Sequence, residues 1–358
     1  MPKKVLIGMS GGVDSSVAAY LMQQAGFHCI GATMQLCTEE LLGSAQGCGS
    51  LSGSQDARHV ADRLGIPFHI LDAAENFQEA VVDPFVHAYE SGLTPNPCIL
   101  CNQHLKFTHM LQQALQLGCD YIATGHYAQI EYNPDLGRYM LYKAADIPKD
   151  QSYFLAGLTQ QQLRHVQFPL GALTKEQVRT IAETQGFLNA QKRDSQDICF
   201  IPDGNCKAFL ERYTGKSYPS GAYLDMQGNV VGTHNGSVAY TIGQRKGLGL
   251  AMGEPVYVCS KDTTRNTVTV GPNSALFHSA LEAENWNWVA TPQLTQPIQV
   301  AAKIRSRHIE QPATVYPMVN GSARVEFAEP QRAITPGQAV VLYDGNTVIG
   351  SGTITKAI

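Results

Sequence analysis

The stretch VLIGMSGGVDSS, residues 5–16, places a run of apolar residues directly before a glycine pair, an aspartate and two serines. The apolar run 5–9 predicts a short strand that is buried on both faces, as in a parallel sheet. Two glycines permit a sharp turn, and we expect a helix over 13–25 that ends at Gly26. A strand, a tight loop and a helix N-terminus form an anion site, because unbonded backbone N–H groups and the helix dipole point into the turn. The segment therefore predicts a phosphate-binding loop.

The order Ser-Gly-Gly-Val-Asp-Ser-Ser is more specific than a lone glycine pair, which is most often an ordinary turn between a strand and a helix. It has neither the lysine of the Walker loop nor the three spaced glycines of the dinucleotide fingerprint. The motif resembles the pyrophosphate loop of the N-type ATP pyrophosphatases, which split ATP into AMP and pyrophosphate to adenylate an oxygen. This resemblance assigns Ser10, Gly11, Gly12, Asp14 and Ser15 to the phosphates, with Asp14 close to Mg²⁺.

Size and composition indicate a globular protein of two or three domains, since 358 residues exceed one average domain. The N-terminal apolar stretch is too short for a signal peptide, and nowhere do eighteen apolar residues run together, so we expect a soluble cytoplasmic protein without membrane contact. Nine cysteines in such a chain are better interpreted as buried thiols, ligands or nucleophiles than as disulfides. A net charge of −4 argues against wholesale coating of nucleic acid but permits a local basic face.

The first part of the chain alternates strand and helix patterns, which predicts a doubly wound, mostly parallel α/β domain over residues 1–205. We expect strands near 5–9, 28–35, 67–73 and 120–125 and helices near 13–25, 55–65, 75–91 and 102–117. Ligands of such sheets bind beyond the carboxyl ends of the strands, which selects the loops after Met9, Met34 and Thr124. The Gly- and Ser-rich stretch 35–54 is interpreted as a mobile loop over this site.

The segments after about residue 174 have a different pattern, in which one last pair of helices is followed by short strands. A self-contained helix is predicted over 174–186, with Thr174 as N-cap, Gln177 at the capping-box position and Gly186 as the stop. After a last short helix over 206–213, short strands predict a central β-rich domain over 206–278 and a C-terminal β-barrel over 279–358. The segments VVGTHNGSVAYTIG and RNTVTVGPN are hairpin-like, and TVYPMVNGSARVEFAEP carries an Asn-Gly turn between alternating strands.

Two cysteines at C-x-x-C spacing, Cys98 and Cys101, lie in TPNPCILCNQHLKF. Asn102 is expected to cap the following helix, which would place Cys101 at a helix N-terminus and favour its thiolate. A single thiol is usually a packing residue, but a pair at this spacing suits a metal, an iron–sulfur cluster or redox chemistry. The candidate for a third, distant cysteine is Cys199 in KRDSQDICFIPDG, where Lys192 and Arg193 would favour thiolate. Cys29 and Cys119 are interpreted as packing residues.

A series of motifs occurs in a fixed order from residue 8 to 249. It begins with the phosphate loop and continues with TPNP followed by CN and KF, then ATGHYA, KDQSYFL, ICFIP and TIGQRKGLG. Together they resemble the tRNA-specific 2-thiouridylase family, and the likeness spans nearly the whole chain. The resemblance implies an N-type pyrophosphatase domain, a central domain and a C-terminal β-barrel that bind tRNA. It implies that the wobble uridine of tRNAs for Lys, Glu and Gln exchanges its 2-oxygen for sulfur, with ATP and Mg²⁺ as cofactors. A persulfide-donating sulfur-relay protein or cysteine desulfurase is the implied partner.

The resemblance also implies site residues. The positions that match ATP contacts are Gly8, Met9, Ser10, Gly11, Gly12, Val13, Asp14, Ser15, Met34 and Gly125. Cys101 matches the nucleophile and Cys199 the cysteine that carries the persulfide. The positions that match contacts to tRNA are Asn96, Pro97, Cys98, Lys149, Asp150, Gln151, Arg305 and Ser306. A target base must be flipped out to reach such a centre. Lys303, Arg305 and Arg307 alternate, which would put their charges on one face of a barrel strand, although from the sequence alone a merely solvated edge is the better interpretation.

One position departs from the family pattern, because many members carry an aspartate where this chain has Cys98. Two mechanisms therefore stay open. In the first, Cys199 carries a persulfide and Cys101 releases its sulfur through a Cys101–Cys199 disulfide. In the second, Cys98, Cys101 and Cys199 ligate a [4Fe–4S] cluster whose open iron holds sulfide. Asp197 also departs from the pattern, and nothing in the sequence explains it. An ATP pyrophosphatase that acts on a small molecule and a non-catalytic RNA-binding module are the competing functions.

Overall fold

The N-terminal domain is a parallel sheet covered by helices on both faces. The computed structural model describes residues 2–36, 51–192 and 198–358, and the side chains of 51 and 52 are also left undescribed. The sheet order is β3 (Phe68–Asp72), β2 (His28–Gln35), β1 (Lys4–Gly8), β4 (Tyr121–Thr124), β7 (Val166–Gln167), and every pairing is parallel. The predicted doubly wound domain is confirmed.

Two apolar clusters sandwich this sheet. On one face pack α1 (Val13–Gln24), α3 (Leu51–Leu64) and α10 (Lys175–Thr184), through buried residues such as Val17, Val60 and Val178. On the other face pack η2 (Cys101–His109) and α7 (Met110–Gln116), through residues such as Phe107 and Met110. The parallel strands end at the same edge, so the loops after β1, β2 and β4 converge there, as the sequence predicts.

The helix that carries the C-x-x-C pair begins earlier than predicted. It starts with α6 (Pro97–Leu100) and runs on without a break through η2 and α7. Asn96 is its N-cap, because the Asn96 side chain accepts a 3.2 Å hydrogen bond from the Cys98 N–H. Asn102 is buried instead, and its amide donates to the Phe154 carbonyl at 3.0 Å. The prediction of Asn102 as cap is wrong because Pro97, with its fixed φ, initiates the helix.

The remaining helices of this domain largely follow their sequence signals. A bent run is formed by α4 (Ala74–Phe77), η1 (Gln78–Val82) and α5 (Asp83–Glu90), where one helix was predicted. The Thr174–Gln177 capping box of α10 is confirmed. Short elements complete the set: η3 (Ile147–Lys149), α8 (Ser152–Leu155), α9 (Gln160–Arg164) and α11 (Cys206–Thr214). Within the described ranges, no helix is both long and apolar enough to span a bilayer.

The central domain is a small sheet of order β10 (Tyr257–Asp262), β11 (Thr267–Gly271), β8 (Gly221–Leu224), β9 (Val230–His234). The predicted hairpin around RNTVTVGPN is confirmed as β10–β11. VVGTHNGSVAYTIG is not a hairpin, because only its first part is a strand and that strand pairs back to β8. Its second part is η4 (Ser237–Ala239), and η5 (Asn273–Leu276) leads on to the barrel.

The C-terminal domain is a closed antiparallel barrel. Its order is β12 (Phe277–Trp288), β15 (Ala323–Arg332), β14 (Gln311–Pro317), β13 (Ile298–Lys303), β16 (Ala339–Asp344), β17 (Thr347–Ala357), and β17 pairs back with β12. The predicted Asn-Gly turn is confirmed at η6 (Val319–Gly321), where Asn320 and Gly321 both have positive φ. Because β13 ends at Lys303, Arg305 and Arg307 do not extend a barrel strand, and the predicted charged face is wrong.

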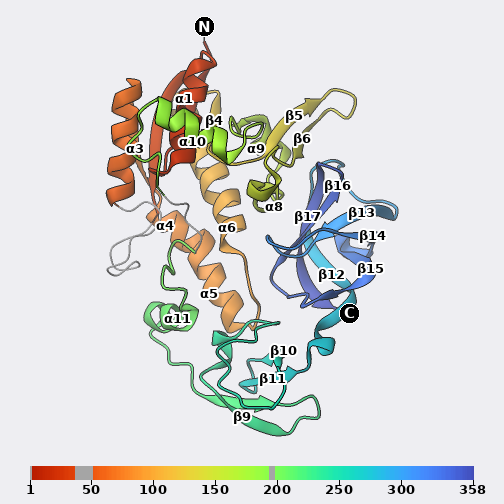
Figure 1. Ribbon diagram of the computed structural model, residues 1–358. Helices are drawn as coiled ribbons and strands as arrows, with labels where there is room; N and C mark the ends of the chain where they lie inside the picture. Colours follow the sequence, from red (N-terminus) through yellow and green to blue (C-terminus); the bar gives the residue numbers. More distant parts are fainter. Residues whose placement is uncertain (1, 37–50, 193–197) are drawn as a thin grey trace.

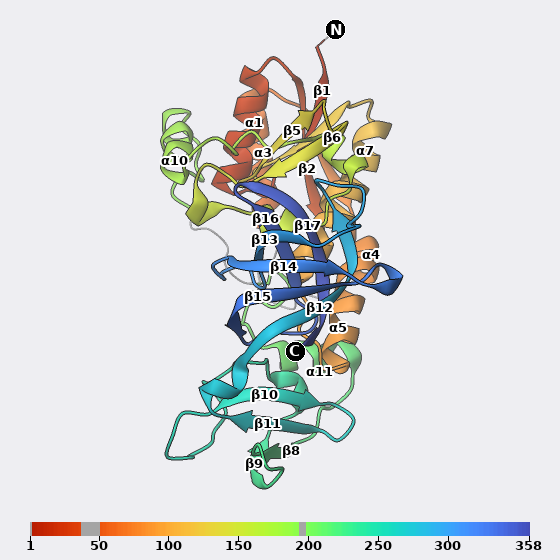
Figure 2. The same ribbon diagram turned by 90° about the vertical axis from the view of Figure 1, so that its right-hand side faces the viewer.

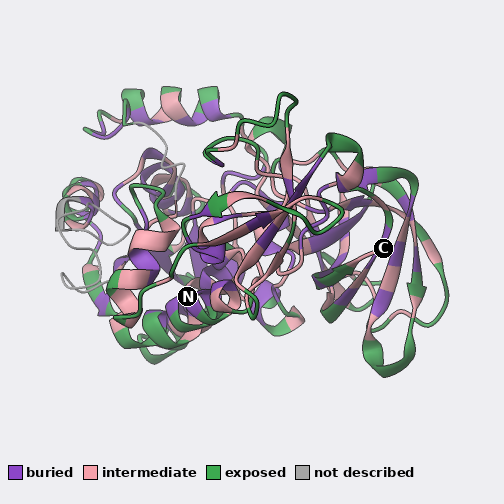
Figure 3. Cartoon of the chain, turned by 90° about the horizontal axis from the view of Figure 1, so that it is seen from below, coloured by how far each residue is buried: buried purple, intermediate pink, exposed green. Residues whose placement is uncertain are grey.

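The domains are joined by more than the linear chain. A hairpin of the N-terminal domain, β5 (Gln129–Asn133) and β6 (Arg138–Tyr142), continues the barrel sheet through the pair Tyr142–Thr347. The Thr94 N–H donates to the Pro336 carbonyl, and the Gln338 amide donates to the Thr94 carbonyl at 2.7 Å. Figures 1 and 2 show the barrel beside the helical domain and the central sheet below both. Buried residues lie along the strands of the sheet and the barrel interior, and exposed ones on the outer helices and loop tips (Figure 3).

Candidate active site

The predicted phosphate loop is a compact turn between β1 and α1. Gly11 has φ +75°, and a Cβ there would lie 2.3 Å from the Gly53 carbonyl oxygen, so both conformation and space require glycine. The Ser10 N–H donates to the Ser15 hydroxyl at 3.2 Å, and that hydroxyl donates to the Gly12 carbonyl at 3.0 Å. No side chain caps α1 at Gly12. The first backbone N–H groups of α1 therefore face the turn, as an anion site requires.

Asp14 of this loop is held by two partners that the sequence analysis missed. The Lys175 ammonium donates to both carboxylate oxygens at 2.7 and 2.8 Å, and the Tyr127 hydroxyl donates to one of them at 2.8 Å. Lys175 is only 9 % exposed and occupies the first helical position after the capping box of α10. The recognisable helix start at Thr174 was the available signal, but only the fold brings it to residue 14.

A pocket opens at the carboxyl edge of the sheet beside this pair. Its volume is about 200 Å³. Of the predicted ATP contacts, Gly8, Met9, Ser10, Asp14, Ser15, Met34 and Gly125 line it. Val13 is a buried core residue of α1, so its side chain does not face a ligand. At Gly125 a Cβ would lie 2.7 Å from backbone atoms of Asp14 and Ser15, which shows how closely the loop after β4 approaches the phosphate loop.

The predicted tRNA-contacting turn at 149–151 is attached to the same loop. The Gln151 N–H donates to the Tyr127 carbonyl at 2.9 Å, and the Tyr127 N–H donates to the Gln151 side chain at 3.0 Å. The Asp150 carboxylate accepts from the Ala144 N–H and from the Ser152 hydroxyl, so it stabilises the turn. Gln151 lines the pocket, whereas Lys149 lies at the end of η3 and is partly exposed. The turn thus contributes Gln151 to the lining of the pocket.

Cys101 and Cys199, far apart in sequence, belong to one apolar cluster. Cys101 is buried and 8 % exposed, and the half-buried Cys199 packs against the same cluster beside Phe200. Met34 and Leu36 belong to this cluster and also line the pocket. The two thiols that the sequence selected separately therefore share an apolar cluster with Met34 and Leu36, which line the pocket.

Cys98 has a different environment from the other two thiols. It is exposed in the first turn of α6, next to the partly exposed Asn96 and the buried Pro97. The helix N-terminus therefore lies at Cys98 rather than at Cys101, which corrects the expectation for Cys101. In the described part of the chain, no three Cys, His, Asp or Glu side chains are gathered so that they could hold a metal ion.

The basic residue expected near Cys199 lies elsewhere. The Lys192 ammonium is 2.8 Å from the Asp56 carboxylate and 3.5 Å from the Gly11 carbonyl, so its charge lies at the phosphate loop. Nearby, the Asn189 amide donates to the Gly11 carbonyl and the Ser16 hydroxyl. Arg193, Asp197 and the thiols of Cys37 and Cys48 lie outside the described residues, as does most of the predicted loop 35–54.

The other thiols behave as packing residues. Cys29 and Cys119 are buried, as predicted. Burial raises the pKa of the Cys29 thiol to about 11, and burial likewise raises the pKa of Cys119. The Cys206 thiol donates to the Tyr89 hydroxyl at 3.8 Å, and burial raises the pKa of Cys206. These thiols are poor nucleophiles at neutral pH because their thiolates are disfavoured.

The basic segment at 303–307 connects two domains. The Arg305 guanidinium donates to the Ala333 carbonyl at 2.6 Å, to the Ile242 carbonyl at 3.2 Å and to the Thr335 hydroxyl. It therefore links the barrel to the TIGQRKGLG segment of the central domain. Burial lowers the pKa of Lys303, while Ser306 is half-buried and Arg307 is exposed.

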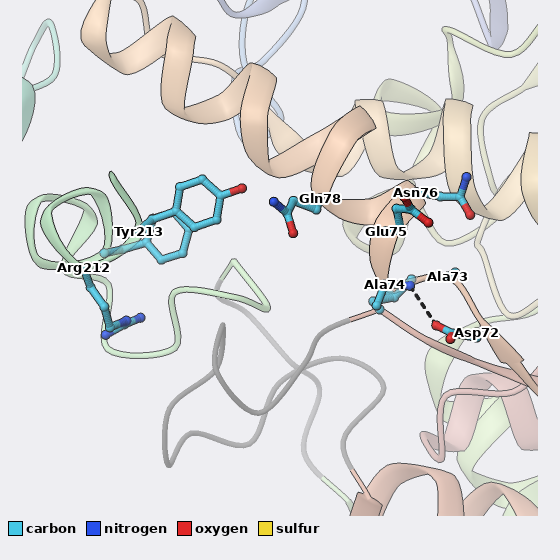
Figure 4. A pocket seen from close by; sticks show the side chains of 10 residues that line it. Asp72, Ala73, Ala74, Glu75, Asn76, Gln78, Arg212 and Tyr213 are labelled. Carbon is cyan, nitrogen blue, oxygen red and sulfur yellow. Dashed lines mark hydrogen bonds between the residues drawn. The ribbon is translucent and has the colours of Figure 1, made fainter. Parts of the chain in front are cut away.

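A second cavity, of about 700 Å³, is larger but carries none of the predicted site residues. It lies between α4 and η1 on one side and α11 on the other (Figure 4). Figure 4 shows Tyr213 and Gln78 directed toward one another across it, with Asp72 and Glu75 at its far end. The Tyr213 hydroxyl donates to Asp83 at 2.6 Å. Leu36 lines both cavities. Because the larger cavity contains none of the predicted site residues, size alone does not identify the reaction site.

Comparison with known proteins agrees with this arrangement. Family models match residues 3–203 (tRNA methyl transferase HUP domain), 207–272 (tRNA methyl transferase PRC-barrel domain) and 278–354 (aminomethyltransferase beta-barrel domain). A protein of Clostridioides difficile (strain 630) named tRNA-specific 2-thiouridylase MnmA is 46 % identical over 100 % of this chain and 99 % of its own. The chain belongs to the MnmA family.

Other relatives give the same result. The MnmA proteins of Acetivibrio thermocellus and Symbiobacterium thermophilum are 47 % and 48 % identical, over 98 % and 99 % of this chain and 99 % and 93 % of theirs. Among solved structures, a 4-thiouridine synthetase–RNA complex with bound ATP is 16 % identical with a TM-score of 0.36, and the match covers 60 % of this chain and 50 % of that one.

Proposed function

We propose that this protein is an ATP-dependent tRNA-uridine 2-sulfurtransferase that converts the wobble uridine of tRNAs for Lys, Glu and Gln into 2-thiouridine. One observation carries the proposal: the phosphate loop and the turn at Gln151 line the same pocket, whose apolar wall continues into the cluster of Cys101 and Cys199. The relatives named tRNA-specific 2-thiouridylase support it.

The first half-reaction activates the base. The C2 carbonyl of uracil is a poor electrophile, and its oxygen leaves only after attachment to a phosphate. Attack of O2 on the α-phosphorus of ATP forms the O2–P bond, breaks the bond to pyrophosphate and converts the oxygen into part of an AMP leaving group. The phosphate loop orients ATP, and Lys175 supplies a buried positive charge beside it. Asp14 fits a Mg²⁺ ion, which in nucleotide sites uses one or two carboxylates together with phosphates and neutralises their charge.

The second half-reaction transfers sulfur. A partner protein loads Cys199 with a persulfide, and its terminal sulfur attacks C2 while AMP leaves. The base is then joined to Cys199 through a disulfide. The Cys101 thiolate attacks the Cys199 sulfur, so that a Cys101–Cys199 disulfide forms and the 2-thio base departs with the electron pair of the broken S–S bond. An external thiol reductant restores both cysteines.

The proposal is tested by incubating the protein with ATP and tRNA that has uridine or cytidine at the wobble position. We expect pyrophosphate release only with the uridine tRNA, and release of AMP together with 2-thiouridine after addition of a persulfide donor. AMP release without tRNA, or an unchanged reaction in Cys199→Ser, would instead favour an ATP pyrophosphatase that acts on a small molecule.

The iron–sulfur alternative is tested separately. Protein purified without oxygen is analysed for iron, acid-labile sulfide and visible absorption, in the wild type and in Cys98→Ala. Colourless protein that thiolates tRNA from a persulfide donor supports the thiol relay. About four irons per chain, lost with Cys98→Ala, would establish the cluster mechanism and replace the relay.

A further inference from the structure

His126 lies where the two substrates of the proposed reaction would meet. It lines the pocket directly after Gly125, which lies close to the phosphate loop. The next residue, Tyr127, accepts a hydrogen bond from the Gln151 N–H with its carbonyl and donates its own N–H to the Gln151 side chain. The segment 125–127 therefore connects the phosphate loop, which would bind the nucleotide, with the turn at Gln151, which would contact tRNA. A side chain at residue 126 can contact both the α-phosphate of a nucleotide and a base inserted beside it.

The His126 ring is held in a defined orientation. Its Nδ1 is hydrogen-bonded to the Thr124 hydroxyl oxygen at 2.7 Å. Its ring centroid lies 5.7 Å from that of Phe107 and 5.9 Å from that of Phe168. When Nδ1 donates its proton to the Thr124 oxygen, the lone pair of the neutral ring is on Nε2. Packing against two aromatic rings and a hydrogen bond at Nδ1 orient the ring, as a positioned proton acceptor requires.

The electrostatic setting keeps this imidazole neutral before the substrates arrive. Burial first, and the positive charge of Lys106 second, hold the pKa of His126 well below its usual value. Among the described residues that line the pocket, Asp14 and Lys106 are the other ionisable groups. Asp14 is occupied by Lys175 and Tyr127, and an ammonium cannot accept a proton. The negative phosphates of ATP would offset Lys106, so the basicity of His126 rises only when nucleotide is bound.

The chemistry of adenylation requires such an acceptor. Uracil carries a proton on N3, and its O2-adenylated form is neutral only after this proton has left. Residue 98 of this chain is a cysteine, so no carboxylate is available at that position. We propose, on the basis of the proposed function, that His126 Nε2 accepts the N3 proton of the target uridine as O2 attacks the α-phosphorus of ATP.

The proton balance closes over the full reaction. The N3–H bond breaks and the Nε2–H bond forms while pyrophosphate leaves with the electron pair of its broken P–O bond. When Cys101 releases the 2-thio base as an anion shared between sulfur and N3, the imidazolium returns its proton to N3. His126 is neutral again at the end of each turnover, and no additional acid or base is consumed.

The experiment compares two substrates that differ in the acidity of N3. Full-length tRNA carries either uridine or 5-fluorouridine at the wobble position, and fluorine acidifies N3 by withdrawing electrons. Pyrophosphate formation is measured in a single turnover for the wild type and for His126→Gln. We expect a loss of about 10²–10⁴-fold with uridine, the range for general base catalysis, and at least tenfold less loss with 5-fluorouridine. Binding of tRNA, measured by filter retention, should change less than about threefold.

Further variants guard against a purely structural effect. Thr124→Val removes the partner of Nδ1 with little change in volume, and we expect a smaller loss that 5-fluorouridine also reduces. Equal losses on both substrates in His126→Gln, or a rate close to that of the wild type, would overturn the proposal. The same would follow if Cys98→Ala, rather than His126→Gln, showed the rescue by 5-fluorouridine, because Cys98 would then be the acceptor. Wild-type protein that releases no pyrophosphate with uridine tRNA refutes the proposed function and this inference with it.

Discussion

Replacing Lys175 with methionine removes the buried cation that neutralises Asp14. The two side chains are 11 % and 30 % exposed, and the ammonium contacts both carboxylate oxygens. Loss of one partner from a fully buried pair costs about 3–5 kcal/mol, but the exposed part of Asp14 and its bond from Tyr127 reduce this. We therefore expect the free energy of unfolding to fall by about 1–3 kcal/mol.

The same substitution should affect the adenylation step more strongly than stability. When Mg²⁺ and ATP reach the phosphate loop, Asp14 can turn to the metal and the Lys175 ammonium to the departing pyrophosphate. One charged donor of this kind contributes about 10²–10³-fold to a rate, because it is already oriented where charge develops. We expect Lys175→Met to slow AMP formation in the presence of tRNA by this factor, with a much smaller change in tRNA affinity.

Pyrophosphate release with saturating tRNA and thermal unfolding without ligands measure the two effects separately. Lys175→Arg keeps the charge and should retain more activity than Lys175→Met. Lys207→Met is the matched control, because Lys207 forms a weaker pair with Glu211 at 3.6 Å on α11. A Lys175→Met protein with wild-type melting temperature and a rate within threefold of wild type would refute the reasoning.

Three further predictions concern the thiols, the loop after β4 and a buried lysine. Cys101→Ser and Cys199→Ser should each abolish 2-thiouridine formation while pyrophosphate is still released with tRNA, as followed by nucleoside analysis and pyrophosphate release; a variant that still thiolates would remove that cysteine from the relay. Gly125→Ala should weaken ATP binding by at least tenfold, because its Cβ would lie 2.7 Å from the backbone of Asp14 and Ser15 and push the loop away. The control for calorimetric titration with ATP is Gly157→Ala, whose Cβ would lie in ordinary contact, at 3.7 Å, with the nearest side chains. Burial lowers the pKa of Lys261 from 10.5 to about 8, and its ammonium has no hydrogen-bond partner among the described residues. Between about pH 8 and 10.5 the unfolded chain holds a proton that the folded chain lacks, so the free energy of unfolding should rise with pH across that window by about 3 kcal/mol. Lys261→Met should lose this rise and should be more stable than the wild type at pH 7. Thermal unfolding of both proteins is measured at pH 7 and at pH 10. An equal change in stability between the two pH values in the wild type and in Lys261→Met would contradict this.

Several features followed from local sequence because local forces decide them. The buried strand before Ser10, the capping box at Thr174 and the Asn-Gly turn at 320–321 each depend on residues within one or two turns of chain. Their hydrogen bonds close within the segment, so the pattern suffices. The order of the motifs along the chain likewise predicted the family.

The errors arose where two local signals compete or where a contact crosses domains. Asn96 and Asn102 can each cap a helix, and Pro97 decided in favour of Asn96. Arg305 has the spacing of a strand residue, but β13 ends at Lys303 and the guanidinium turns to the central domain. Lys192 is adjacent to the loop of Cys199 in sequence, yet its ammonium lies at Gly11 and Asp56.

The sequence by itself determined the phosphate loop, the α/β class of the first domain and the choice of Cys101 and Cys199. Only the tertiary structure decided what surrounds them: Lys175 and Tyr127 at Asp14, Gln151 at the loop of His126, and one apolar cluster behind both thiols. The physical reason is that these partners are separated by many residues in the chain. Their proximity depends on parallel strands that end at one edge and on helices packed from both faces, which no local pattern encodes.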